Sequence, residues 1–351
     1  MPAVETDALV IGAGPAGLFQ VFQLGLQGIR CHVVDVLPQA GGQCAALYPD
    51  KPLYDIPGLP HVTGLELTQR LLEQVKPFAP QFHFEQEVTG LTPSPEAPGQ
   101  WSVDTANGLT FTAKTVFIAA GVGAFVPRAL VLDGEGAFNP RHIHTGSAID
   151  KLNEAAASGR FQNACCVVVG NDAQAVNTAL ALAQTDAPSQ APQSVTLVHR
   201  KDEFDAPEPQ LQALASWRAR GNIQVALGQP VALGAKQLQL AKDDDSEVTL
   251  PLDELFVCLG LSPRLGRLAS WGLTLHKRQV TVDPASMATN LAGIYAIGDI
   301  NDYPGKRKLI VCAFHEATLA AFAAAARVFP EQPVRLEYTT TSRLLKARLG
   351  V

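Results

Sequence analysis

The chain has 351 residues, of which 47% are hydrophobic and 17% are charged. At roughly 100–200 residues per domain this length suggests about two domains, and the composition excludes a disordered or collagen-like chain. With 27 Lys+Arg against 33 Asp+Glu, the net charge is −6. Because contacts to phosphate backbones need clustered cations, we do not expect nucleic-acid binding. No apolar run approaches the ~20 residues that span a bilayer, and the N-terminus does not resemble a signal peptide. We therefore expect a cytoplasmic protein without a membrane span.

The first organising feature is a strand–helix–strand unit. The apolar run Ala8–Ile11 predicts a buried parallel strand, and the apolar segment Leu18–Gly28 has helical length. The next strand, Cys31–Val34, ends on Asp35. The unit has the order of a nucleotide-binding βαβ motif.

A glycine-rich turn joins the first strand to the helix, with Gly12, Gly14 and Gly17 in a GxGxxG pattern. The first glycine makes the turn, the second lets the backbone approach a pyrophosphate, and the third lets the helix pack on the strand. The helix N-terminus offers free N–H donors to that pyrophosphate. Asp35 lies where a carboxylate binds ribose hydroxyls. The pattern predicts a dinucleotide site.

Between this unit and the next, the pattern favours a helix over Gly64–Lys76 and strands over Phe82–Leu91, Trp101–Val103 and Leu109–Thr112. A further buried strand is expected at Val116–Gly121, which ends on glycine.

A second unit of the same kind begins at Cys165–Val169. The turn Gly170–Ala175 follows, then an expected helix over Val176–Gln184 and a strand over Ser194–His199. Leu255–Gly260 repeats the pattern of an apolar strand that ends on glycine. Because the same features recur in the same order, the sequence predicts an α/β fold of two Rossmann-like, three-layer dinucleotide-binding domains.

The first of these domains is expected to be discontinuous. The segment after about Ile294 has no domain of its own, so it returns to complete the first domain. We expect an FAD-binding domain at 1–124 plus 289–351 and an NAD(P)H-binding domain at 125–288. The crossings would lie near 122–127 and 283–290.

A second strong motif is Thr289-x-x-x-x-Ile294-Tyr295-Ala296-Ile297-Gly298-Asp299. With the first glycine turn, this pattern resembles the flavoprotein disulfide reductases, in which the aspartate holds the ribitol of FAD. Those enzymes need a redox-active cysteine pair. Here Cys44 has Pro49 at the partner position, and none of the six cysteines forms a CxxC. Cys165 and Cys166 lie in an apolar strand, where successive side chains point to opposite faces, so we expect buried thiols rather than dithiol chemistry.

Three stretches are more specific: Gly41–Lys51, Tyr54–Pro60 and Tyr338–Ser342, the last within the extension Val334–Val351. Over essentially the whole chain, the sequence resembles the thioredoxin-reductase-like (type 2) ferredoxin–NADP⁺ reductases. The resemblance implies a homodimeric, FAD-dependent oxidoreductase that passes a hydride from NADPH to flavin N5. Single electrons then pass to ferredoxin or flavodoxin, and no catalytic side chain is implied.

The resemblance also implies contacts with FAD. Asp35 would bind the adenosine ribose and Val88 would present backbone to the adenine. Gln43 would lie by the isoalloxazine, and Tyr48 would stack on one face of it. The remaining expected contacts are Asp299 at the ribitol, Phe125 near the flavin and Thr340 from the tail.

The second nucleotide site departs from the family pattern. NADP binding is expected at Gly170, Ala175, His199, Arg200 and Lys201. However, Asp172 stands where the family has the second glycine, and Asp205 stands where it has an arginine. Asp172 either presents a charge to the phosphate or turns away to cap the helix. The sequence leaves NADPH, NADH and no pyridine nucleotide open.

The remaining signals are weaker. His142 and His144 form the only close pair among eight histidines, and because no carboxylate cluster joins them, no metal is expected. Lys306, Arg307 and Lys308 are candidates for a basic patch that docks an acidic ferredoxin; Arg343, Lys346 and Arg348 are the tail cations that would extend it. A disulfide reductase and a non-enzymatic FAD-binding protein remain alternatives.

Overall fold

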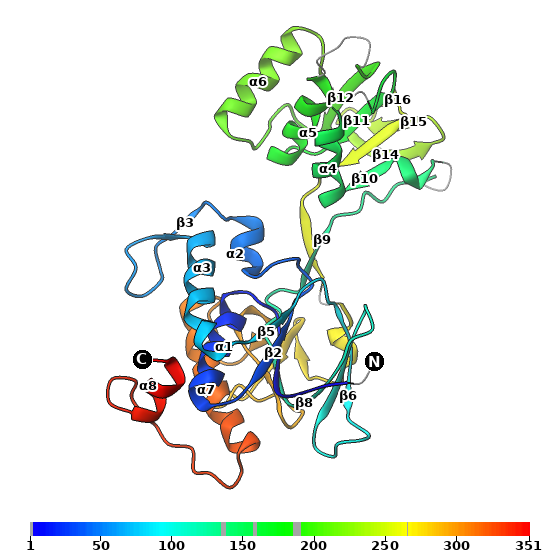
Figure 1. Ribbon diagram of the computed structural model, residues 1–351. Coiled ribbons are helices and arrows are strands. Elements are labelled where there is room, and N and C mark those ends of the chain that lie inside the picture. Colours follow the sequence, from blue (N-terminus) through cyan, green and yellow to red (C-terminus); the bar gives the residue numbers. More distant parts are fainter. Residues whose placement is uncertain (1–2, 135–137, 157–159, 185–190, 265) are drawn as a thin grey trace. The chain divides into compact units, whose positions relative to one another are not determined.

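The computed structural model describes residues 3–134, 138–156, 160–184, 191–264 and 266–351 (Figure 1). The chain divides into two compact units, one made of residues 1–124 and 264–351 and the other of residues 125–263. The strands β9 (Ala124–Pro127) and β18 (Leu261–Arg264), at which the chain passes between the units, pair as a two-stranded sheet.

The second crossing lies earlier in the chain than the 283–290 that the sequence predicts. Leu268, Trp271 and Val280 are buried in the hydrophobic core of the first unit, so the segment before 289 belongs there. Its apolar residues are separated by polar ones and form no strand-length run, which is why the sequence pattern assigned them to the other domain.

A seven-stranded sheet forms the centre of the first unit. Its first strands pair in parallel, whereas the last three form an antiparallel meander. In spatial order the strands are β5 (Gln81–His83), β2 (Cys31–Val34), β1 (Val4–Ile11), β8 (Thr110–Ile118), β7 (Trp101–Thr105) and β6 (Val88–Pro93), with β21 (Ile294–Ala296) paired to β8.

The predicted strand over Phe82–Leu91 is two strands in the structure. β5 ends at His83 and β6 begins at Val88, because Glu85 adopts a positive φ of 56° and turns the chain between them.

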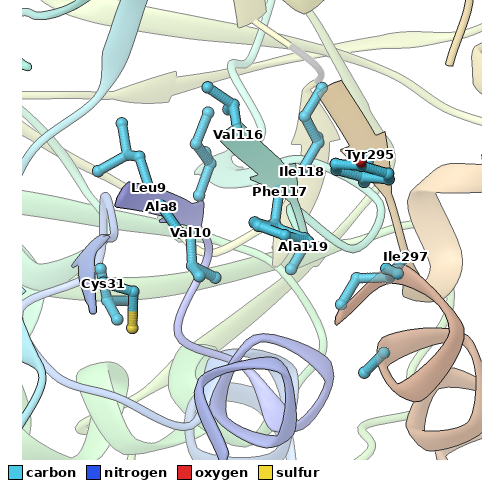
Figure 2. Close-up of a cluster of buried hydrophobic side chains, with 14 of the residues drawn as sticks. Ala8, Leu9, Val10, Cys31, Val116, Phe117, Ile118, Ala119, Tyr295 and Ile297 are labelled. Carbon is cyan, nitrogen blue, oxygen red and sulfur yellow. The ribbon is translucent and has the colours of Figure 1, made fainter. Parts of the chain in front are cut away.

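The core of the first unit lies between this sheet and its helices. Figure 2 shows part of it, in which Val10, Phe117 and Tyr295 come from three neighbouring strands and the Phe117 and Tyr295 rings stack. The helices of the unit are α1 (Pro15–Gln27), α2 (Gly42–Leu47), α3 (Gly64–Val75), α7 (Ile310–Val328) and α8 (Arg343–Leu349). The short strands are β3 (Pro52–Leu53), β4 (Val62–Thr63), β19 (Leu275–His276), β20 (Gln279–Thr281) and β22 (Asn301–Asp302).

Helix α7 corrects the expectation that no segment is long and apolar enough to cross a membrane. Its 19 residues meet that test by length and composition. However, its buried face, which includes Ala313, Ala317 and Ala320, packs against α1, and Glu316 in its middle is fully buried. These are the features of a core helix.

The second unit is built on a five-stranded parallel sheet. Its strands, in spatial order, are β10 (Ile143–Thr145), β17 (Glu254–Val257), β11 (Cys165–Val169), β12 (Ser194–His199) and β13 (Gln224–Leu227). An antiparallel sheet adds β14 (Gln229–Gly234), β15 (Gln237–Ala241) and β16 (Glu247–Pro251), and the helices are α4 (Ser147–Ala156), α5 (Ala173–Ala183) and α6 (Glu208–Ala219).

Candidate functional site

The glycine turn after β1 leaves room for a phosphate. Gly12 has a φ of 109°, and a Cβ there would lie 2.4 Å from the Ala119 carbonyl oxygen. A Cβ on Gly17 would lie 1.8 Å from the Gly12 oxygen, so the fold itself requires both glycines. Gly14 is different, because a Cβ there would meet only the Gly42 Cα at 3.8 Å. Gly14 is also the N-cap of α1 and makes no side-chain cap, which leaves the first N–H groups of the helix available to an anion.

A second glycine turn closes against the first. The Gly41 N–H donates to the Ala13 oxygen at 2.9 Å, and a Cβ on Gly42 would lie 2.9 Å from the Gly14 Cα. Gln43, one residue into α2, places its Nε2 at 3.2 Å from where a Cβ of Gly121 would be. The GGQ stretch therefore lies beside the phosphate turn and the end of β8.

Asp35 is buried at the end of β2 and belongs to this site. Its carboxylate accepts the Ala13 N–H at 2.6 Å and the Leu37 N–H at 2.8 Å. Burial raises the pKa of Asp35, against the opposing effect of these N–H donors. The Asp35 carbonyl accepts the Gln86 N–H at 2.9 Å, which ties it to the start of β6, where Val88 is buried. Asp35 and the start of β6 thus lie at the same end of the site.

Tyr48, Cys44 and Asp299 lie together. The Cys44 thiol donates to the Tyr48 phenol oxygen at 3.5 Å. Burial raises the pKa of both groups, and the nearby Asp299 carboxylate raises both further. The phenol and the thiol are therefore neutral, and the sequence-predicted residues Tyr48 and Asp299 belong to one site.

Glu316 and Lys306 were missed as site residues. The Gly298 N–H donates to Glu316 Oε2 at 2.7 Å, and the Lys306 ammonium donates to the Gly298 oxygen at 2.8 Å. The pair is itself bonded at 2.5 Å. The sequence signal was an acidic residue inside the apolar segment of α7. The Lys306 side chain is only 6% exposed, so its predicted place in a surface docking patch is wrong. Arg307 and Lys308 are exposed.

The C-terminal tail lies at the other end of α1. The Arg348 guanidinium donates to the Leu26 oxygen, near the helix end, and a cavity of about 290 Å³ lies between the tail, α1 and α7. The 13 residues of α1 span roughly 20 Å, so the Arg348 contact lies about a helix length from Gly14; Thr339, next to Thr340, lines the cavity. Phe125 lies in β9, and its side chain is outside the described residues.

In the second unit, Asp172 caps a helix. Its Oδ1 accepts the Ala175 N–H at 2.9 Å as the N-cap of α5. Gly170 before it has a φ of 150°, and a Cβ there would lie 2.0 Å from the Cys258 oxygen. The sequence left two interpretations of Asp172, a charge presented to the phosphate or a helix cap. The structure shows the helix cap.

The residues after β12 surround the same turn. The Asp205 N–H donates to the Asn171 oxygen at 2.7 Å, which brings the exposed Asp205 to the turn. Arg200 is bonded to Gln229 at 2.5 Å, and Lys201 is exposed. His199 Nδ1 lies 3.0 Å from the Lys201 oxygen. These contacts place Asp205 at the turn and tie Arg200 to the start of β14.

Among the described residues, no group of three His, Cys, Asp or Glu is placed to hold a metal ion. One carboxylate joins the histidine pair: Glu254 accepts from His142 at 2.8 Å and from His144 at 2.7 Å. Burial acts to raise the pKa of Glu254, but the hydrogen bonds and electrostatic interactions with His144 and His142 together lower it. Cys165 and Cys166 are both buried and free.

Known proteins resemble this chain over most of its length. A model of the family described as pyridine nucleotide-disulphide oxidoreductase matches residues 6–317. The chain is 50% identical over 360 residues to the ferredoxin–NADP reductase of Paracidovorax citrulli, covering 99% of this chain and 97% of that protein. It is 49% identical over 355 residues to that of Leptothrix cholodnii, covering 99% and 92%.

Solved structures share the fold. The bacillithiol disulfide reductase of Staphylococcus aureus has a TM-score of 0.59 at 15% identity and covers 92% of this chain and 99% of its own. The thioredoxin reductase of T. acidophilum has a TM-score of 0.54 at 18% identity and covers 92% and 98%. At these identities the likeness shows the fold alone, and it confirms the predicted α/β class.

Proposed function

Since the chain belongs to the pyridine nucleotide-disulphide oxidoreductase family, and within it to the type 2 ferredoxin–NADP⁺ reductases, we propose that it is an FAD-dependent ferredoxin–NADP⁺ oxidoreductase. The observation that carries the proposal is the cradle between Gly14 and Gly42 at the uncapped N-terminus of α1, with Asp35 and Asp299 in the same unit. The two relatives, matched over almost their whole length, bear the same name.

The residues of the first unit fit FAD. The open space at Gly14 and the free N–H groups of α1 suit a pyrophosphate. The buried Asp35 carboxylate suits the ribose hydroxyls, and Asp299 suits the ribitol. We propose that Gln43 and the neutral Tyr48 ring line the isoalloxazine and exclude water from it, with Val88 backbone at the adenine.

FAD, when bound, accepts a hydride and gives up electrons singly. The chain's own part is to bind and orient, and no acid, base or nucleophile among its residues is assigned a step. Cys44 is the cysteine beside Tyr48, and its raised pKa keeps it protonated. Because the nucleophilic form of cysteine is the thiolate, this supports a reductase without a dithiol.

The second unit supplies the nicotinamide site in this proposal. Gly170 and Ala175 form the phosphate turn, and His199, Arg200 and Lys201 would meet the 2′-phosphate of NADPH. Because the Asp172 carboxylate caps α5 and takes the Ala175 N–H, this helix end has one donor fewer for a pyrophosphate than the uncapped α1, and nucleotide binding there rests on the turn and on Arg200 and Lys201. Asp205 is the charge that opposes it.

Ferredoxin, or a flavodoxin, is the proposed acceptor. The exposed cations of the first unit that suit an acidic partner are Arg307 and Lys308, with Arg343 and Lys346 on α8. We further propose a cytoplasmic homodimer. We propose that the tail contact with the flavin comes from a second copy of the chain, because within one chain Arg348 of the tail is bonded at the end of α1 that is distant from Gly14.

The experiment is NADPH-driven reduction of a bacterial ferredoxin by the FAD-loaded protein, measured at 50 and 300 mM salt. The proposal expects turnover that falls at high salt, because the docking charges are screened over about a Debye length. Turnover with dithiothreitol-type disulfides but none with ferredoxin or flavodoxin would overturn it in favour of a disulfide reductase.

A further inference from the structure

Gly298 is held on both sides by one buried ion pair. Its N–H donates to Glu316, and its carbonyl accepts from Lys306, which itself is bonded to Glu316. The side chains of Lys306 and Glu316 are 6% and 0% exposed. Gly298 has a φ of 76°, so the peptide turns in the left-handed region next to Asp299.

Glu316 collects further donors from the same loop. Asn301 Nδ2 donates to Oε2 at 3.0 Å, and the Tyr303 hydroxyl donates to Oε1 at 2.9 Å. The Lys306 ammonium also lies 5.5 Å from the centre of the Tyr303 ring. The loop from Gly298 to Lys306 is therefore fastened to a single carboxylate on α7.

Stability alone does not account for such a pair. Burying two charges costs desolvation energy, and replacing a buried ion pair with apolar residues is often neutral or stabilising. Unlike apolar packing, a hydrogen-bonded ion pair fixes the orientation of the groups that it binds. Here those groups are the N–H and the C=O of Gly298, the neighbour of Asp299.

We propose that Lys306 and Glu316 are positioning residues for the flavin: they fix the Gly298 peptide, which in turn presents Asp299 to the ribitol of FAD. The inference rests on the proposed FAD site. Both charges lie beside Gly298, the neighbour of Asp299, which in this proposal contacts the flavin. They therefore also contribute to the electrostatic potential at the flavin.

The test compares Lys306→Met and Glu316→Gln with the parent, and Lys76→Met serves as a matched control because Lys76 is an exposed lysine elsewhere in the first unit. Two quantities are measured on each apoprotein reloaded with FAD: the Kd for FAD, from quenching of flavin fluorescence, and the flavin midpoint potential, from equilibration with redox dyes.

Both buried-pair variants are expected to weaken FAD binding by about tenfold or more, because each leaves a buried charge without its partner. Lys306→Met leaves a negative charge and lowers the midpoint potential, whereas Glu316→Gln leaves a positive charge and raises it. Lys76→Met leaves both quantities unchanged. Shifts of opposite sign are not produced by general loss of structure.

FAD affinities within twofold of the parent, or potentials that move in the same direction, would overturn the proposal. Should Lys306→Met fail to fold, the near-isosteric Glu316→Gln decides alone, through its FAD Kd and the sign of its potential shift. Neither measurement involves ferredoxin or NADPH. A failed positioning role is therefore distinguishable from a failed reductase function, which the parent's turnover reports.

Discussion

Asp172 and Asp205 meet at the phosphate turn of the second unit, where their backbones form an isolated parallel bridge. The Asp172 carboxylate accepts a hydrogen bond as the cap of α5, whereas Asp205 is exposed. The turn of a proposed NADPH site thus carries a negative charge where the family resemblance predicts an arginine.

Replacing that charge should improve NADPH binding. Asp205→Arg removes a carboxylate and adds a guanidinium, and at surface distances a charge contact is worth on the order of 1 kcal/mol. We expect the KM for NADPH to fall by about 3- to 10-fold at low salt, with a smaller change for NADH.

The control is Glu203→Arg, which makes the same change in net charge at an exposed position in the same segment. An equal fall in KM for this variant would mean that overall charge, rather than the position of Asp205, determines the effect.

The Asp172 cap should be visible as stability. Asp172→Ala removes the acceptor of the Ala175 N–H and is expected to lower the free energy of unfolding of the second unit by about 1 kcal/mol. Asp172→Asn keeps a capping oxygen and should lose only a few tenths. Urea unfolding followed by circular dichroism measures both. Equal losses in the two variants would show that the charge, not the cap, matters.

The cysteine pair of β11 should be dispensable. Cys165 and Cys166 are buried, and burial strongly raises the pKa of the Cys166 thiol. Cys165→Ala with Cys166→Ala is therefore expected to keep the parent's rate of NADPH-driven ferredoxin reduction within about twofold. A loss of more than a hundredfold in a variant that still binds FAD would restore the disulfide reductase alternative.

Buried thiols also predict a loss of stability in alkali. Burial raises the pKa of Cys31 to about 12, whereas an unfolded thiol ionises at about 8.5. The stabilising contribution is therefore complete below that pH and is lost as the pH rises toward 12. The difference in free energy of unfolding between the parent and Cys31→Ala should shrink between pH 8 and pH 10.5. A difference that stays constant over this range contradicts the prediction.

Tyr48 should quench the flavin. Tyr48→Ala removes the ring proposed to stack on the isoalloxazine, so the fluorescence of the bound flavin is expected to rise several-fold. Tyr48→Phe keeps a ring and should stay near the parent. If Tyr48→Ala leaves the fluorescence of bound FAD unchanged, the ring does not lie on the flavin.

Local sequence patterns predicted the fold well. The runs at Ala8–Ile11 and Cys165–Val169, each followed by a glycine turn, predicted the parallel strands of both sheets because strand periodicity and the steric demands of Gly12 and Gly170 are short-range properties. The crossing at 263–264 was missed, since Leu268 and Trp271 are isolated apolar residues whose burial depends on the tertiary fold.

The site was predicted where one motif contains all the information, and missed where partners are distant. From the sequence, Lys306 was interpreted as a surface cation. In the fold, α7 places Glu316 beside it and the two form an ion pair. Glu254 begins β17 and contacts His142, which directly precedes the neighbouring strand β10 and is more than a hundred residues away in the chain. Such pairings arise from strand order and helix packing, which single-sequence patterns do not encode.

The most direct test of the reductase account is an anaerobic visible spectrum of the FAD-loaded protein, titrated with NADPH and in parallel with NADH. The account predicts that the oxidised flavin bands bleach with NADPH at near-stoichiometric amounts and return when oxidised ferredoxin is added. A flavin that neither nucleotide bleaches, but that dithionite does, would contradict it and would identify the protein as an FAD-binding protein without a working nicotinamide site.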